Sequence, residues 1–311
     1  MARRTRSDGP AGFVVVNKEP GWTSHDVVAK LRGILRQRRT GHAGTLDPSA
    51  TGVLVVGVGK ATRLLRYLQT TDKTYDGTLV LGSTTDTLDA DGQVTATFDM
   101  SAITPEQVRL AASALTGDLL QVPPMVSAIK IDGQRLHDLA RQGLEVDRPA
   151  RPVRVDRFDV SAIDDGRFSF VVACSTGTYV RSLVDDLGRS LGGGAHVTSL
   201  RRTAVGTFTL DQALRLEEIE ALVQQSGSVE DSGVLLSPAD ALEGFETLTA
   251  GAEEQVAVSR GTVFGRSRLA ASGPGPFAVV DQGGALLAVY EAFGSDQIKP
   301  SVVLVDLAGQ Q

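Results

Sequence analysis

The stretch on which the fold depends reads Gly41-His42-Ala43-Gly44-Thr45-Leu46-Asp47-Pro48-Ser49-Ala50-Thr51-Gly52-Val53 and continues as Leu54-Val55-Val56. Its single carboxylate, Asp47, lies among glycines, a proline and small polar residues, directly before an apolar run. A tight, glycine-flanked loop beside a strand can hold a carboxylate rigidly, desolvate it in part and present it to a ligand. Taken alone, the spacing fits such a site and an ordinary structural turn equally well.

Strands and helices are predicted in irregular order around this loop. The apolar patterns predict strands at 12–16, 52–59, 73–81, 153–163 and 167–174. Helices are predicted at 25–35 after a cap at Thr23 or Ser24, and at 61–69, 104–115 and 179–191. Because this order differs from regular βαβ units, we expect an α+β domain with a mixed, mainly antiparallel sheet.

A second, smaller unit is expected after an acidic helical stretch at 217–242. Gly and Pro turns separate short apolar runs that predict strands at 254–258, 276–281, 286–293 and 298–305. Several short strands in so few residues are typical of a small β barrel or sandwich. We find no candidate catalytic cluster in this unit.

Composition bounds the class of protein. The chain has 311 residues, of which 41% are hydrophobic, and no apolar run reaches the roughly 20 residues that a membrane helix needs. One cysteine, Cys174, excludes an internal disulfide and a Cys-rich zinc site, in agreement with a reducing compartment. We therefore expect a cytoplasmic protein with no membrane partner.

Charge is distributed unevenly along the chain. Residues 1–75 carry 13 Lys and Arg against 5 Asp and Glu, whereas the remaining 236 residues carry 18 against 32. The basic part coincides with the Asp47 loop and can neutralise phosphates of a polyanion. A solvated, arginine-rich helix face is the alternative. The basic side chains concerned are Lys30, Arg32, Arg36, Arg38, Arg39, Lys60, Arg63 and Arg66.

Several familiar ligand-binding motifs are excluded because the spacing of their residues is wrong. Residues 57–62 lack the first glycine of a phosphate loop, and Ala61 follows Lys60 where Ser or Thr is required. The stretch 86–92 has the wrong spacing for a calcium loop, and Thr97 stands where the closing Glu is needed, so we interpret it as an acidic turn. The four histidines lack zinc-helix spacing and cysteine partners, so we expect no metal.

Two further groups can complete a site around Asp47. Tyr75 offers a flat ring on which a base can stack and a phenol that can reach a proton. Arg181, at the start of a predicted helix, can pair with Asp47 and keep it ionised and oriented, as a nucleophile or general base requires. Taken singly, each residue is explained by ordinary packing or surface exposure.

Taken together, the segments resemble the bacterial tRNA pseudouridine-55 synthases, the TruB family. The resemblance covers roughly residues 12–210 and begins with the 41–54 signature. The other landmarks follow in the family's order: Asn17-Lys18, Pro20-Gly21, Thr23-Ser24, Lys73-Thr74-Tyr75, Leu81-Gly82, Thr85-Asp86-Thr87, Asp89, Pro123-Pro124, Ser127-Ala128, Lys130, Ala140-Arg141, Gly143, Gly177-Thr178-Tyr179, Arg181, Asp185-Asp186-Leu187-Gly188, Gly194-Ala195-His196 and Leu200-Arg201-Arg202.

The resemblance implies a domain organisation and a partner. It implies a basic arm without regular structure at 1–11, a pseudouridine synthase catalytic domain at 12–235 and a PUA-like C-terminal domain at 236–311. The substrate would be tRNA, through its T stem-loop, and neither a cofactor nor a metal would be needed. We expect a monomer.

The resemblance also implies a reaction and its catalytic residues. The T-loop uridine, position 55 in tRNA numbering, would flip out of the RNA and be isomerised to pseudouridine. Asp47 would act as the nucleophile, at the ribose C1′ or at the base. Tyr75 would stack on the base and is a candidate to take the C5 proton, and Arg181 would pair with Asp47.

Other residues would bind the substrate. Leu200 would complete the apolar wall of the pocket, and His42 would fill the space that the flipped uridine vacates. Tyr179 belongs to the same substrate-binding set, and Lys18 would support the site from the first landmark. We expect the glycines of the signature to let the uridine come close to Asp47.

Two other functions remain open from the residues alone. A non-catalytic RNA-binding or RNA-folding module would also explain the basic first quarter of the chain. A carboxylate-dependent hydrolase would need a second acid close to Asp47, and neither motif next to it in the sequence provides one.

Overall fold

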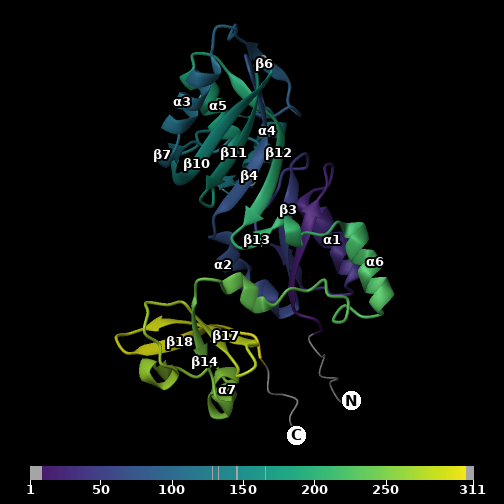
Figure 1. Cartoon of the computed structure of the whole chain (residues 1–311), viewed down its shortest axis with the longest axis vertical. Coiled ribbons are helices and arrows are strands. Elements are labelled where there is room, and N and C mark those ends of the chain that lie inside the picture. Colours follow the sequence, from purple (N-terminus) through teal and green to yellow (C-terminus); the bar gives the residue numbers. More distant parts are fainter. Residues whose placement is uncertain (1–8, 128, 132, 145, 165, 306–311) are drawn as a thin grey trace.

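The computed structural model of the chain describes residues 9–305, except 128, 132, 145 and 165. Most of the expected basic arm, residues 1–8, and Ala128 of the family's landmarks lie outside the described residues. Figure 1 shows a larger unit built on one sheet and, below it, a smaller unit that contains the C-terminal strands.

The larger sheet has nine strands in the described part of the chain. Their order is β1-β3-β12-β4-β11-β10-β7, with β2 beside β3 and β13 beside β12. Only the two-residue pairing of β3 with β12 is parallel, which confirms a mixed, mainly antiparallel sheet in an α+β domain. The strands are β1 (Gly12–Lys18), β2 (Thr40–His42), β3 (Thr51–Val58), β4 (Lys73–Leu81), β7 (Gly117–Gln121), β10 (Arg151–Asp164), β11 (Arg167–Cys174), β12 (Ala195–Val205) and β13 (Phe208–Thr209).

Helices flank this sheet. Thr23 and Thr104 begin α1 and α3 with capping boxes, in which the threonine side chain accepts from the backbone and the third helical residue bonds back. The predicted helix at 61–69 is divided into a 3₁₀ turn and a short α-helix. The helices are α1 (Ser24–Ile34), η1 (Gly59–Leu64), α2 (Leu65–Gln69), α3 (Pro105–Ala114), α4 (Leu136–Arg141), α5 (Val180–Ser190), η2 (Leu210–Gln212) and α6 (Leu216–Ser226). Two short hairpins, β5 (Ser83–Thr85) with β6 (Val94–Thr97) and β8 (Lys130–Ile131) with β9 (Gln134–Arg135), complete this unit.

The two strands that flank the Asp47 loop in space, β1 and β3, are buried on both faces. Phe13 and Val15 enter one core cluster, whereas Val14 and Val16 enter another, and β3 divides its side chains in the same way. A strand covered on both sides reads as an uninterrupted apolar run rather than as an alternating one. Each fully buried side chain of this size contributes about 1.5–3 kcal/mol, so this region is a firm base for the loop.

The smaller unit is a five-stranded sheet, which confirms the expected β-rich C-terminal domain. Its order is β14-β16-β17-β18-β15, and its elements are η3 (Pro238–Leu242), β14 (Glu246–Thr249), α7 (Ala252–Ser259), β15 (Phe264–Gly265), η4 (Arg266–Leu269), β16 (Phe277–Val280), β17 (Leu286–Phe293) and β18 (Gln297–Val303). The predicted strand at 254–258 is wrong, because these residues form helix α7. A five-residue stretch is too short to separate the strand period from the helix period, and the acidic first turn with Glu253 and Glu254 favours a helix.

The two sheets share one apolar core. Val280 and Val289 of the smaller sheet lie in the same buried cluster as Leu64 and Leu68 of the larger unit. Arg63 adds a hydrogen bond to the carbonyl of Val303 at 2.7 Å. The C-terminal unit is therefore packed against η1 and α2, which lead directly into β4, and the boundary between 235 and 236 stays a prediction.

Candidate active site

The loop that carries Asp47 connects β2 to β3 and is held by its backbone. The buried Ser24 hydroxyl accepts from the Leu46 amide at 2.9 Å and donates to the Leu46 carbonyl at 3.1 Å. The Pro48 carbonyl accepts from the Gly21 amide at 2.9 Å and from Lys18 Nζ at 2.9 Å. The residues on either side of Asp47 are thus fixed to β1 and to the start of α1, and the carboxylate projects from a rigid loop.

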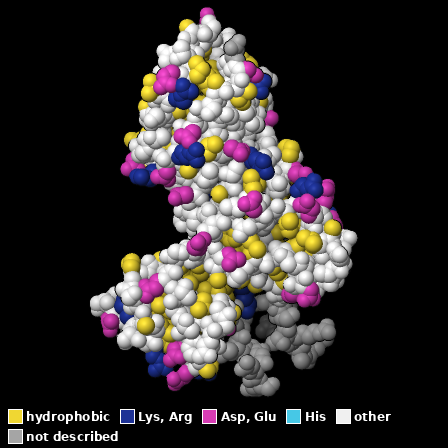
Figure 2. All heavy atoms as spheres, viewed as in Figure 1, with side chains coloured by type: hydrophobic (Ala, Val, Ile, Leu, Met, Phe, Trp, Pro, Cys, Tyr) yellow, Lys and Arg dark blue, Asp and Glu magenta, His cyan; other side chains and the backbone are white. Residues whose placement is uncertain are grey.

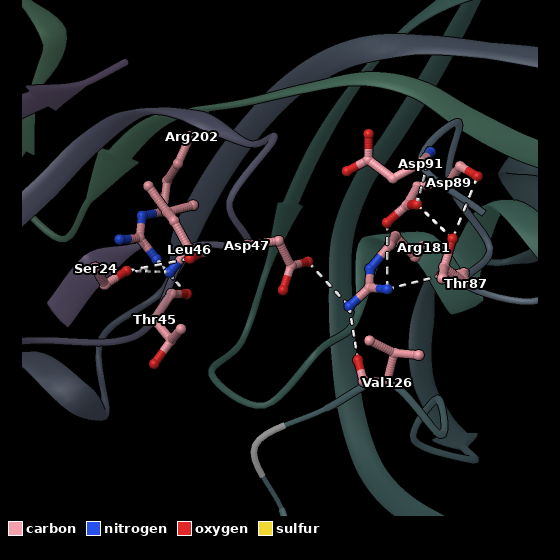
Figure 3. A network of polar contacts seen from close by, with 10 residues as sticks. All are labelled: Ser24, Thr45, Leu46, Asp47, Thr87, Asp89, Asp91, Val126, Arg181 and Arg202. Carbon is pink, nitrogen blue, oxygen red and sulfur yellow. Dashed lines mark hydrogen bonds and ion pairs between the residues drawn. The ribbon is translucent and has the colours of Figure 1, made fainter. Parts of the chain in front are cut away.

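Arg181 meets Asp47 directly. Its Nη2 lies 2.9 Å from Asp47 Oδ2, and its Nη1 lies 3.3 Å from Asp89 Oδ2 (Figure 3). The same guanidinium donates to the carbonyls of Thr87 and Val126 at 2.7 and 2.9 Å. A cation in the first turn of a helix, here α5, faces an unfavourable dipole. Two carboxylates and two carbonyls offset that cost and fix the guanidinium, whose side chain is only 5% exposed.

The environment raises the pKa of Asp47. Burial is the largest cause and the nearby Asp89 carboxylate adds to it, whereas the charges of Arg181 and Lys18 oppose it. The carboxylate is nevertheless reachable, because its side chain is 40% exposed. Asp89 is itself oriented by hydrogen bonds from the Thr87 hydroxyl and the Asp91 amide. Asp47, Arg181 and Asp89 therefore form one charge-coupled unit.

A cavity of about 310 Å³ opens over this unit, a size suited to a small ligand group. Asp47, Arg181 and Leu200 line it, so three of the predicted site residues meet there. Its remaining walls come from the loop after Asp47, from the 89–91 turn and from β4 and β12: Ser49, Ala50, Thr51, Asp76, Asp89, Ala90, Asp91, Val197, Thr198, Ser199 and Arg201.

Tyr75 lies on β4 next to Asp76, which lines the cavity. Tyr75 and Leu200 are half-buried, and both pack against the same two core clusters. Burial is the main cause that raises the pKa of the Tyr75 phenol, and Arg202 opposes it through its charge and a side-chain hydrogen bond. The phenol is therefore neutral near pH 7 and close to the Asp47 side of the sheet.

Lys18 and His42 lie near the loop but are not among the residues that line the cavity. Burial lowers the pKa of Lys18 to about 8, against the opposing effect of Asp47. His42 lies edge-on to His25 with ring centroids 5.4 Å apart, and its buried Nδ1 finds no hydrogen-bond partner among the described residues. Burial, followed by the charges of His25 and Arg202, lowers the pKa of His42, so the imidazole is neutral near pH 7.

Tyr179 caps α5 next to Arg181. Its backbone amide and carbonyl both bond to the Gln121 side chain, at 2.7 and 3.1 Å. Burial is the largest cause that raises the pKa of its phenol, and the Asp47 charge is another. Tyr179 is thus near the carboxylate but is not one of the cavity-lining residues.

Three supporting residues were not assigned a role from the sequence. Ser24 and Arg202 hold the loop, and Asp89 holds Arg181. Asp89 stood in the stretch interpreted as an acidic turn, and Arg202 in a landmark in which only Leu200 was given a role. The missing signal was spatial, since β12 and the 86–92 turn meet the loop only after folding.

The basic residues are less available than the sequence suggested. Lys30 pairs with Glu220 at 2.8 Å, Arg32 donates to the Thr40 carbonyl, and Arg63 and Arg66 bond to β18. On the face in Figure 2, basic and acidic side chains are interspersed rather than gathered in a patch of one sign. Several of the arginines expected to meet phosphates therefore stabilise the fold.

No group of three or more His, Cys, Asp or Glu side chains is placed to hold a metal ion among the described residues. No helix within those residues is both long and apolar enough to span a membrane.

The fold and the site define a pseudouridine synthase. The chain is similar to the solved Cbf5-Nop10-Gar1 complex, with a TM-score of 0.74 and 26% identity over 94% of this chain and 84% of that chain. It also shares its fold with the archaeal box H/ACA sRNP Nop10-Cbf5 complex, with a TM-score of 0.71 and 23% identity over 96% and 87%.

Sequence comparison narrows the class to one family. The profile of the TruB family pseudouridylate synthase (N terminal domain) matches residues 32–180, and that of the tRNA pseudouridylate synthase B C-terminal domain matches 181–243. The chain is 45% identical to a tRNA pseudouridine synthase B of a Mycobacterium species over 94% of this chain and 96% of the relative. It is 48% identical to the one of Geobacter sulfurreducens over 80% and 81%. The chain belongs to the TruB family of pseudouridylate synthases, a family of isomerases, and this confirms the enzyme class that the motifs implied.

Proposed function

We propose that the chain isomerises the T-loop uridine of tRNA, at position 55, to pseudouridine, with Asp47 as the nucleophile. One observation carries the proposal: a reachable carboxylate, oriented by a buried arginine at 2.9 Å, faces a cavity of about 310 Å³. The relatives named tRNA pseudouridine synthase B support tRNA as the substrate. tRNA also implies the cytoplasm as the working compartment, and because one chain supplies every group used here, a monomer suffices.

The reaction conserves every atom of the nucleotide. Attack of the Asp47 carboxylate on C1′ breaks the bond to N1 and leaves its electron pair on the uracil ring. The ring turns, C5 forms the new bond to C1′ as the carboxylate leaves, the C5 proton is removed and N1 takes up a proton. Attack of Asp47 on the base is the alternative first step. Neither route has a net redox change, so its stoichiometry calls for no cofactor.

Each of the remaining site residues contributes to one step of this reaction. Arg181 keeps the carboxylate ionised against the burial that raises its pKa. Tyr75 stacks on the flipped base, and its neutral phenol passes its own hydroxyl proton to solvent as it receives the C5 proton. Leu200 closes the apolar wall. His42 and Tyr179 contact the RNA around the flipped nucleotide, and Lys18 supports the loop through Pro48. Extrusion of a base costs a few kcal/mol, and stacking in the pocket offsets it.

The test follows hydrogen rather than mass, because the product is an isomer of the substrate. A T-arm stem-loop that carries tritium at uridine C5 should release the label to water without any added cofactor. Asp47→Asn should release none at detectable rates while still binding the RNA. The matched control is Asp159→Asn, which removes an exposed carboxylate that also pairs with an arginine, Arg157. Release by Asp47→Asn at the wild-type rate would exclude Asp47 as nucleophile, and absence of release by the wild type would exclude the function.

A hydrolytic alternative gains one observation from the structure. Three further carboxylates, Asp76, Asp89 and Asp91, line the same cavity, whereas the motifs next to Asp47 in the sequence supplied none. A hydrolase would pass the ribose to water and release free uracil, which chromatography separates from pseudouridine. Family membership favours the isomerase, and uracil as the main product would reverse that preference.

A further inference from the structure

Arg202 is a charged residue where the fold would more easily accept an apolar one. It lies on β12, is 1% exposed and ranks among the largest fully buried side chains. Within the described part of the chain, no carboxylate lies within ion-pair distance of its guanidinium. Removing an ion from water costs several kcal/mol unless good hydrogen bonds replace the lost solvation. Such a cost indicates that the side chain does more than fill space.

The guanidinium is satisfied by the loop that carries Asp47, by β3 and by the Tyr75 phenol. Its Nε donates to the Val53 carbonyl at 2.8 Å, and its Nη2 donates to the Gly44 carbonyl at 3.1 Å. Nη1 reaches the Thr45 carbonyl at 3.5 Å, a longer contact. Figure 3 shows Arg202 and Arg181 on opposite sides of Asp47 in that view. Arg181 therefore holds the carboxylate itself, whereas Arg202 holds the backbone that leads to it.

Arg202 also stands where the strands of the two principal site residues meet. Within the sheet it is opposite Tyr75 of β4 on one side and opposite Gly52 of β3 on the other. A Cβ on Gly52, whose φ is +94°, would lie 2.2 Å from the Arg202 carbonyl. Glycine is thus required for this close approach, a different role from the expected one of admitting the uridine.

The charge of Arg202 reaches the other supporting groups. It contributes to lowering the pKa values of Lys18, Lys73 and His42, although burial is the larger cause in each case. It opposes the burial that raises the pKa of Tyr75. The charge of Arg202 therefore favours the neutral forms of Lys18, Lys73 and His42 and the ionised form of Tyr75.

We propose that Arg202 is a positioning residue that fixes the distance between Asp47 and Tyr75 by bonding the Asp47 loop to the strand that pairs with the Tyr75 strand. The proposal rests on the function proposed above, because it acts through those two residues. A guanidinium presents a rigid fork of donors, whereas a lysine offers one compact charge and cannot reach three separated carbonyls. Geometry, and not charge alone, is thus the quantity that Arg202 supplies.

The experiment compares Arg202→Lys with Arg202→Gln, and uses Arg157→Lys, an exposed arginine of β10, as the control. Single-turnover tritium release, the Kd for the T-arm stem-loop and the melting temperature are measured for each protein. We expect turnover to fall about 100-fold in both Arg202 variants, the scale of a misplacement near 1 Å. The Kd should change less than threefold, and the control should match the wild type.

Three results would overturn the proposal. The first is turnover of Arg202→Lys within threefold of the wild type, which would mean that any buried cation suffices. The second is parallel loss of turnover and RNA binding, or recovery of turnover on cooling to a temperature at which the variant is fully folded, which would indicate a merely structural role. The third is failure of both variants to fold, which assigns Arg202 to stability alone. An inactive wild type would instead refute the proposed function.

Discussion

The two faces of the Asp47 loop use arginine in opposite ways. On the cavity face, Arg181 meets two carboxylates, and the group as a whole responds to protons. On the inner face, Arg202 meets three backbone carbonyls and the Tyr75 phenol, and no carboxylate shares its charge through an ion pair within the described residues. The cavity face therefore sets the protonation of Asp47, and the inner face sets its position. Changes on the first face should move the pH profile through Asp47, whereas an uncharged change on the second face, such as Ser24→Ala, should leave the profile in place.

The largest effect is expected from Arg181→Met. Without the guanidinium, Asp47 loses the main influence that lowers its pKa, so that pKa should rise further and the carboxylate should lose its orientation. We expect about a 1,000-fold loss of turnover near neutral pH, with an acid limb at higher pH than in the wild type and little change in Kd. Single-turnover rates over pH 5–9 measure the loss of turnover and the position of the acid limb.

The control for Arg181→Met is Arg189→Met, an exposed arginine on the same helix that pairs with Asp185. It should retain the wild-type rate and profile. Equal losses of turnover and RNA affinity in Arg181→Met would mean that Arg181 binds a phosphate, and the contrast between the two faces would then fail.

Asp89→Asn should shift the pH profile in the opposite direction. The Asp89 charge raises the pKa of Asp47, so its removal should lower that pKa and move the acid limb of turnover to lower pH. Turnover on the plateau should fall about 30-fold, because Arg181 loses one of the two carboxylates that fix it. The control is Asp86→Asn in the same hairpin, whose carboxylate accepts from the Gln93 amide. An acid limb that moves to higher pH would contradict the coupling.

Ser24→Ala tests the inner face without touching a charge. The Leu46 amide and carbonyl would lose their shared partner in a buried place, at a cost of about 1–3 kcal/mol for each unsatisfied group. We expect a lower melting temperature, a several-fold lower turnover and an unchanged pH profile. Ser228→Ala, which removes an exposed hydroxyl bonded to Asp231, is the control. A shifted acid limb in Ser24→Ala would show that the inner face also sets protonation.

The sequence predicted the fold correctly where a local pattern of residues was compatible with only one kind of secondary structure. The double-sided burial of β1 and β3 produced apolar runs that predicted strands, and the sequence placed the start of α1 after Thr23 or Ser24 and the start of α3 at about residue 104. The Asp47–Arg181 contact was expected, and the structure contains it at 2.9 Å. The catalytic roles assigned to these residues stay predictions until turnover is measured.

The sequence could not predict what depends on long-range pairing. Strand β12, which lies between β3 and β4, carries Arg201, Arg202 and small polar residues, and its pattern did not mark it as a central strand. The bulge of β12 near Thr198 breaks the alternation of side chains that a regular strand shows. The need for glycine at position 52 depends on the Arg202 carbonyl, which lies beside it only in the folded protein. Arg63 and Arg66 read as phosphate ligands because their partners lie more than 230 residues away.

The smallest effect on turnover is expected from Lys18→Met. This variant tests how the buried Lys18 on the inner face changes the free energy of unfolding. The folded pKa of Lys18 is about 8, below the value of 10.5 for the free group, so between these values the unfolded chain binds the proton and the folded chain does not. The wild type should therefore gain up to ~3 kcal/mol of unfolding free energy relative to Lys18→Met as pH rises from 8 to 10.5. Urea unfolding at pH 7, 8.5 and 10 measures this difference, with Lys299→Met, an exposed lysine paired with Glu291, as the control. A difference that is constant with pH would mean that Lys18 keeps its ordinary pKa in the folded protein, and the inner face would then hold two buried cations up to about pH 10 instead of only below about pH 8.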